Sequence, residues 1–165
     1  MEYCGGGDLF EKIQTNPDGI SEKHAADIMY QVFYAMSHCH EVGIVHRDLK
    51  PEHIMFVGSS VRVIDFGLSK RLKNKDDRLE STVGTPYFIA PEVLEGSYGL
   101  ECDCWSMGVI LYLALCGRLP FGGTNPAAIF AKVRQADFSF KKRYWRNVSK
   151  EAKDLITKLL RKDPA

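Results

Sequence analysis

The side chains best suited to chemistry lie in the run 43–56, which reads G-I-V-H-R-D-L-K-P-E-H-I-M-F. A charged hexad stands here between two short apolar runs, and it places a carboxylate, Asp48, two residues from an amine, Lys50. A second carboxylate, Asp65, follows an alternating β-branched stretch that predicts a strand over 61–68. One interpretation takes the nearby imidazoles and carboxylates as a metal-dependent hydrolase, which predicts bound zinc or manganese. Its ligands would be His46, Asp48, His53 and Asp65.

The same hexad resembles the catalytic loop of a protein kinase, whose pattern is H-R-D-L-x-x-x-N. The resemblance implies that Asp48 takes the proton of a substrate hydroxyl and that Lys50 reaches the transferring phosphate of ATP. It also implies a Mg²⁺ ligand at position 53, where this chain has His53 instead of asparagine. An imidazole nitrogen prefers softer divalent ions than magnesium. Three outcomes stay open: weak activity with one metal, an altered metal preference, or loss of catalysis with retained binding.

Two further motifs follow at the spacing of a protein kinase. D-F-G stands at 65–67, and A-P-E stands at 90–92 after G-T-P-Y. In the family, Asp65 would hold the Mg²⁺ that bridges the nucleotide phosphates, and Phe66 would pack against His46 beside Gly67. Glu92 would pair with an arginine that lies beyond the end of this chain.

The polar stretch 69–80 has no consistent period and predicts a loop, which the resemblance makes an activation segment. The activation segment continues past residue 80, and the hydroxyl groups considered in it are those of Ser81, Thr82 and Thr85. Arg47 could pair with a phosphate on Ser81 or Thr82 and so order the segment. Glu80 could instead stand in for a phosphate, and both alternatives stay open.

The N-terminal run M-E-Y-C-G-G-G-D resembles the hinge of a kinase, where adenine binds. By that resemblance Met1 would be the gatekeeper, the backbone of Glu2 and Cys4 would meet the adenine edge, and Met55 would form the floor beneath it. Asp8 would approach the ribose, and its spacing from Glu11 also predicts a capping box.

Downstream runs such as G-T-P-Y-F-I-A-P-E-V-L and C-D-C-W-S-M-G-V-I-L-Y are similar to those of the calcium/calmodulin-regulated kinases, most of all the calcium-dependent protein kinases. That similarity implies protein substrates with a basic residue upstream of the serine or threonine, attracted by Asp8 and Glu52. No EF-hand pattern is present, so a regulatory calcium-binding segment would lie outside this chain.

The elements that must position these residues are mostly helices. Three- and four-residue apolar spacing predicts a helix over 21–41, and an apolar face predicts one over 149–161. The strongly apolar run 100–116, which stops at Gly117, predicts a buried helix, and a further helix is expected over 126–135. The fold class expected is mainly α with short β hairpins, as in the large lobe of a kinase without its small lobe. Residues 1–165 would be a partial kinase domain, truncated at both ends. Asp103 would bond the backbone of the catalytic loop, whereas His38 and His40 are predicted to be helix-end residues.

The charge balance, the apolar runs and the cysteines of the sequence restrict which partners and which cellular location are expected. Lys and Arg number 22 against 21 Asp and Glu, so the net charge of +1 predicts no nucleic-acid partner. No apolar run is long enough for a membrane span, and five cysteines without a disulfide pattern predict a reducing, cytoplasmic location.

The function expected is transfer of the ATP γ-phosphate to protein serine or threonine, with ATP and Mg²⁺ as cofactors. The family's glycine-rich loop and ATP lysine precede the hinge, so the chain alone is expected to be inactive. The alternative is a non-catalytic, pseudokinase-like or truncated protein-binding module.

Overall fold

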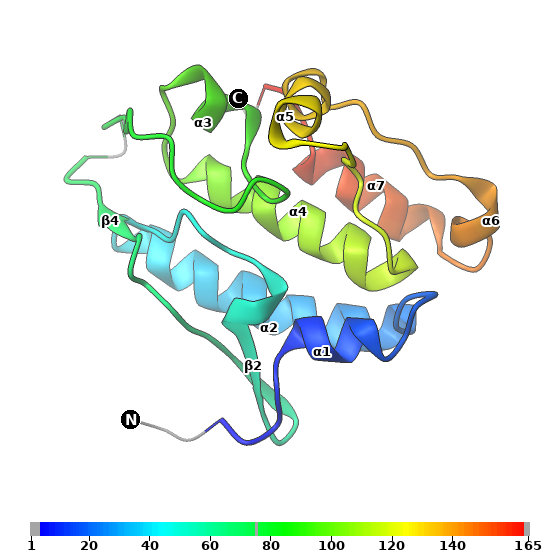
Figure 1. Ribbon diagram of the computed structural model, residues 1–165. Coiled ribbons are helices and arrows are strands. Elements are labelled where there is room, and N and C mark those ends of the chain that lie inside the picture. The colour runs from blue at the N-terminus through cyan, green and yellow to red at the C-terminus, as the bar shows by residue number, and fades with distance from the viewer. Residues whose placement is uncertain (1–3, 75, 164–165) are drawn as a thin grey trace.

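The computed structural model describes residues 4–74 and 76–163, and helices make up more of these residues than strands do. Two long helices, α2 (Glu22–Glu41) and α4 (Glu101–Cys116), lie side by side through the centre, and α7 (Lys150–Leu159) packs against α4 (Figure 1). The short helices are α1 (Leu9–Gln14), α3 (Pro91–Glu95), α5 (Pro126–Gln135) and α6 (Lys142–Trp145), with a 3₁₀ turn η1 (Pro51–His53). The predicted fold class, mainly α with short hairpins, is confirmed.

The bounds of α2 follow the sequence closely. Ser21 caps the helix by accepting a hydrogen bond from the backbone of His24 at 3.4 Å. The buried face carries the apolar residues spaced at three and four along the run: Ala25, Ile28, Met29, Val32 and Met36. The prediction of a helix from Ser21 to about Glu41 is confirmed.

Most residues of helix α4 are buried, as its strongly apolar sequence predicts. It ends where Gly117 adopts a left-handed φ of 66°, which glycine adopts without strain. At Gly108 the neighbouring helix comes so close that an added Cβ would lie 2.8 Å from the Cβ of Leu159 in α7. The side of α7 that carries Leu159 therefore packs against α4.

Two small antiparallel sheets flank the helices. Strand β1 (Ile44–Val45) pairs with β4 (Lys70–Arg71), and β2 (Ile54–Val57) pairs with β3 (Ser60–Val63), with Ile54 opposite Val63. The strand predicted to run to Leu68 is wrong in its end, because β3 stops at Val63. Asp65 takes a left-handed φ of 61°, which no strand accommodates.

The capping box predicted at α1 is confirmed: Glu11 N donates to Asp8 Oδ1 at 2.8 Å, and Asp8 N donates to Glu11 Oε2 at 3.4 Å. All five cysteines are free. Burial raises the pKa of the Cys102 and Cys104 thiols, so both are neutral packing groups. Among the helices within 4–74 and 76–163, none has the length and hydropathy required to cross a bilayer.

Candidate active site

A buried carboxylate at the start of α4 holds the loop that follows β1. Asp103 is 0% exposed, and its two oxygens accept hydrogen bonds from the backbone N–H groups of His46 and Arg47, each at 2.9 Å. Arg47 takes a left-handed φ of 71°, a costly conformation for a residue with a side chain. The two charge-assisted hydrogen bonds compensate for that strain and fix the loop that carries Asp48.

His40 takes part in the same anchor, which the sequence did not reveal. Its Nε2 lies 2.8 Å from Asp103 Oδ2, so the C-terminal end of α2 is tied to the start of α4. We predicted only a helix-end residue here. The two partners are 63 positions apart in the chain, and no local spacing relates them.

Asp48 is held from two directions. Its Oδ1 accepts hydrogen bonds from Thr85 N at 3.0 Å and Thr85 Oγ1 at 2.8 Å. Its Oδ2 lies 3.2 Å from Lys50 Nζ, which also donates to Thr85 Oγ1 at 3.3 Å. The fold thus brings together a carboxylate, an ammonium group and a hydroxyl from two separate segments.

His46 is fully buried and packs against the D-F-G turn. Its ring lies 4.8 Å from that of Phe66, and burial lowers its pKa, so the imidazole is neutral. Nε2 must donate to the carbonyl of Ile64 at 3.0 Å, which leaves Nδ1 to accept from Asp48 N at 3.3 Å. Both nitrogens of His46 are therefore used in protein hydrogen bonds, and neither is free to bind a metal.

His53 lies between the two candidate carboxylates. Its Nδ1 is 2.9 Å from the backbone oxygen of Asp48, and its Nε2 is 3.3 Å from Asp65 Oδ2. The other oxygen of Asp65 accepts from Gly67 N at 3.2 Å. Across the part of the chain that the structure describes, no group of three or more His, Cys, Asp or Glu side chains could hold a metal ion. The four-ligand hydrolase site is therefore not formed.

The segment before α1 runs beside β2. Gly6 N donates to Phe56 O at 3.1 Å and Phe56 N donates to Gly7 O at 2.9 Å, which sets Asp8 opposite Met55. A Cβ on Gly6 would lie 2.7 Å from the Cβ of Phe56, so only glycine permits this approach. Asp8 and Met55 are thus neighbours. The hinge residues Met1 and Glu2 lie outside the described residues, whereas Cys4 is the first described residue.

Beyond the D-F-G turn, the polar segment meets Arg47. Arg47 Nη1 donates to Ser81 Oγ at 2.9 Å and to Tyr98 Oη at 3.3 Å. Tyr98 Oη in turn donates to the backbone oxygen of Ser81 at 2.6 Å. The Thr82 hydroxyl donates instead to Val93 O at 3.4 Å. Of the two hydroxyls considered for a phosphate, Ser81 is the one in contact with Arg47.

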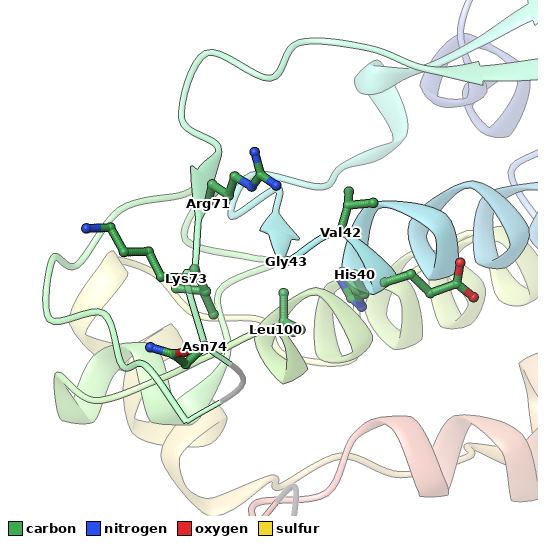
Figure 2. Close-up of a pocket in the computed structure, with 9 residues that line it drawn as sticks. His40, Val42, Gly43, Arg71, Lys73, Asn74 and Leu100 are labelled. Atoms are coloured by element: carbon green, nitrogen blue, oxygen red, sulfur yellow. The ribbon is translucent and has the colours of Figure 1, made fainter.

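A cavity of about 710 Å³ lies beside Gly43, which precedes β1, and Arg71 of β4. Figure 2 shows it between the end of α2, the strand carrying Arg71 and the start of α4 at Leu100. His40 lines the cavity, and the same side chain contacts Asp103. Asp48, Lys50 and Asp65 are not among its lining residues.

Comparison with known proteins identifies this arrangement. The family model described as protein kinase domain matches residues 1–165. Calcium-dependent protein kinase 5 of Plasmodium berghei (strain Anka) is 46% identical over 164 residues, covering 97% of this chain and 29% of that protein. Calcium/calmodulin-dependent serine/threonine-protein kinase 1 of Oryza sativa subsp. japonica is 47% identical over 167 residues, covering 99% and 28%. CDPK-related kinase 5 of Arabidopsis thaliana is 44% identical over 168 residues, again covering 99% and 28%.

The chain thus spans under a third of the length of these relatives. The match to the family model, by contrast, extends over all 165 residues. The chain therefore belongs to the protein kinase domain family.

Proposed function

We propose that the protein carrying this chain transfers the γ-phosphate of ATP to serine or threonine hydroxyls of other proteins. The observation that carries the proposal is the environment of Asp48, whose Oδ1 is held by Thr85 and whose Oδ2 faces Lys50 at 3.2 Å. This fixed carboxylate is suited to orient a hydroxyl group and accept its proton, and the adjacent ammonium is suited to the charge of a phosphate.

In the proposed reaction the substrate hydroxyl oxygen bonds to the γ-phosphorus as the bond from that phosphorus to the departing ADP oxygen breaks. The hydroxyl proton passes to Asp48, and Lys50 stays close to the phosphoryl oxygens. Asp65, which is more than half exposed, would hold a Mg²⁺ ion that neutralises charge on the nucleotide phosphates. An oxygen donor of this kind fits magnesium.

The donor set at position 53 does not fit a second Mg²⁺ ion. Magnesium requires oxygen ligands in near-octahedral geometry, whereas His53 offers one imidazole nitrogen. No step of the proposed reaction is routed through a metal at this position.

Adenine would bind along the segment that precedes α1. Asp8 and Met55 are opposite one another there, in keeping with a ribose contact and an adenine floor. The backbone of Glu2 and Cys4, and the side chain of Met1, would complete this end of the nucleotide site.

Glu52 supports the proposed preference for a basic residue upstream of the acceptor. Its Oε2 is buried, and no hydrogen-bond partner for it is present among residues 4–74 and 76–163. A buried carboxylate oxygen without a donor is costly, and a lysine or arginine of the substrate would satisfy it once the Glu52 side chain turns toward solvent. Asp8 offers a second acid, although its Oδ1 already caps α1.

The activation segment gives a proposed point of control. A phosphate on Ser81 would meet the guanidinium of Arg47, whose Nη1 is now 2.9 Å from the Ser81 hydroxyl. We further propose that calcium regulates the protein through a segment outside these residues, in keeping with the names of the relatives.

The experiment is a phosphoryl-transfer assay with radiolabelled ATP and a serine peptide, with and without an upstream arginine. The wild-type protein should phosphorylate the arginine peptide faster, and Glu52→Gln should reduce that preference, with the peptide KM carrying the change. Equal rates on both peptides would contradict the specificity, and absence of transfer to either would contradict the kinase function.

A second candidate function is non-catalytic binding of a protein partner. It is favoured by His53, which contacts Asp65 where the family has an asparagine. Exchange of His53→Asn decides between the two. Transfer that appears only in the variant identifies a disabled enzyme, whereas transfer in the wild type removes this candidate.

A further inference from the structure

We infer that His53 converts the second cation position into a mixed nitrogen and oxygen site, in which His53 Nε2 and Asp65 Oδ2 bind Mn²⁺ in preference to Mg²⁺. The inference deepens the proposed function by naming the metal class at the same site. It is stated as a binding property, so that it can be tested without phosphoryl transfer.

The tautomer of His53 follows from its partners. Nδ1 lies 2.9 Å from the backbone oxygen of Asp48, and a carbonyl oxygen only accepts, so Nδ1 carries the hydrogen. In the neutral ring Nε2 then presents a lone pair, and this lone pair meets Asp65 Oδ2 at 3.3 Å. The lone pairs of His53 Nε2 and Asp65 Oδ2 repel each other when nothing lies between them. A cation placed between the two atoms attracts both lone pairs and so stabilises the arrangement.

One oxygen of the Asp65 carboxylate, Oδ2, is available to bind such a cation. Oδ1 is engaged by the backbone N–H of Gly67, whereas Oδ2 lies 3.3 Å from His53 Nε2 and belongs to a side chain that is 57% exposed. The hydrogen bond from Nδ1 to a backbone carbonyl is the support that ligating histidines commonly have, because it fixes the ring and its tautomer.

The spacing of the two atoms suits adjacent ligands of one ion. Ligand bonds of about 2.1 Å to atoms 3.3 Å apart enclose an angle of roughly 100°, close to neighbouring positions in octahedral or tetrahedral coordination. The proposal uses two protein ligands, so the remaining positions would be filled by water or by phosphate oxygens. The site should therefore be weak without nucleotide.

The selectivity comes from the nitrogen. Magnesium demands oxygen ligands and gives up its water reluctantly, whereas Mn²⁺ accepts both carboxylate and imidazole. Replacing an amide oxygen by an imidazole nitrogen therefore favours manganese over magnesium at this position.

The test is pulsed electron paramagnetic resonance of the chain with Mn²⁺ alone. We expect a ¹⁴N coupling from a directly bound imidazole, lost in His53→Asn, with a dissociation constant for Mn²⁺ raised at least about tenfold. Asp65→Asn should weaken Mn²⁺ to a similar degree. Excess Mg²⁺ should displace Mn²⁺ poorly from the wild type and readily from His53→Asn.

The matched control is His38→Asn, because His38 also lies near a carboxylate, Glu41 at 3.9 Å, but on the exposed surface. This variant should retain the coupling and the affinity, and circular dichroism should show all variants folded. A wild-type spectrum without ¹⁴N coupling, or equal Mn²⁺ affinity in wild type and His53→Asn, overturns the inference. Metal binding with the predicted signature but no phosphoryl transfer would instead count against the proposed function alone.

Discussion

Glu92 is a buried carboxyl group whose ionisation should destabilise the fold. It lies in the first turn of α3, is 8% exposed, and its Oε2 has no hydrogen-bond partner among residues 4–74 and 76–163. Burial raises its pKa from 4.5 to about 7, and the neighbouring carboxylates Glu101 and Glu95 act in the same direction. The perturbation that tests this is Glu92→Gln, which keeps the shape and removes the charge.

The sign and size follow from proton linkage. The pKa of the folded state lies above that of the unfolded state, so the folded chain binds more protons between pH 4.5 and about 7. Its free energy of unfolding therefore falls as pH rises through this window. The interval from 4.5 to about 7 corresponds to at most about 3 kcal/mol, at 1.36 kcal/mol for each pH unit.

The assay is urea unfolding of both proteins at about pH 5 and pH 8, followed by circular dichroism. The variant should gain about 1–3 kcal/mol relative to wild type on going from the lower to the higher pH. Taking the difference between the two proteins cancels the other groups that titrate in this window. Glu151→Gln, on the exposed side of α7, should show no such gain. Parallel pH profiles for Glu92→Gln and wild type would refute the reasoning.

Three further substitutions test other contacts. Asp103→Ala leaves two backbone donors of the loop that carries Asp48 unpaired and should lower the unfolding free energy by about 2–4 kcal/mol in urea; a loss under 1 kcal/mol would contradict the anchor. Gly108→Ala should cost about 1–3 kcal/mol in the same assay, because the new Cβ meets Leu159, and a more stable protein would contradict the close packing. Thr85→Val should lower kcat roughly tenfold with little change in KM, since Asp48 loses the Thr85 hydroxyl; an unchanged kcat would show that this bond is dispensable.

The helices could be predicted from the sequence because local forces specify them. Apolar residues at three- and four-residue spacing define α2, and Gly117 ends α4 where a left-handed residue is needed. The end of β3 was not predictable in this way. Asp65 leaves the strand direction through a left-handed backbone conformation, which an alternating pattern does not encode.

The candidate site likewise contains residues that the sequence predicts and contacts that only the folded chain creates. Motif spacing indicated Asp48, Lys50 and Asp65, and the fold places the first two within 3.2 Å of each other. The contact of His40 with Asp103 joins the end of one helix to the start of another, so it arises only in the folded chain. The tautomer and bridging position of His53 likewise depend on a backbone carbonyl and a carboxylate from different segments.

The measurement that tests the central claim most directly is the single-turnover rate of γ-phosphate transfer to a serine peptide by the protein carrying this chain, compared with its Asp48→Asn variant. The account predicts transfer by the wild type and a rate lowered about 10²–10⁴-fold in the variant, with binding of ATP and peptide retained. A variant that transfers phosphate as fast as the wild type would contradict the assignment of Asp48 as the group that accepts the proton.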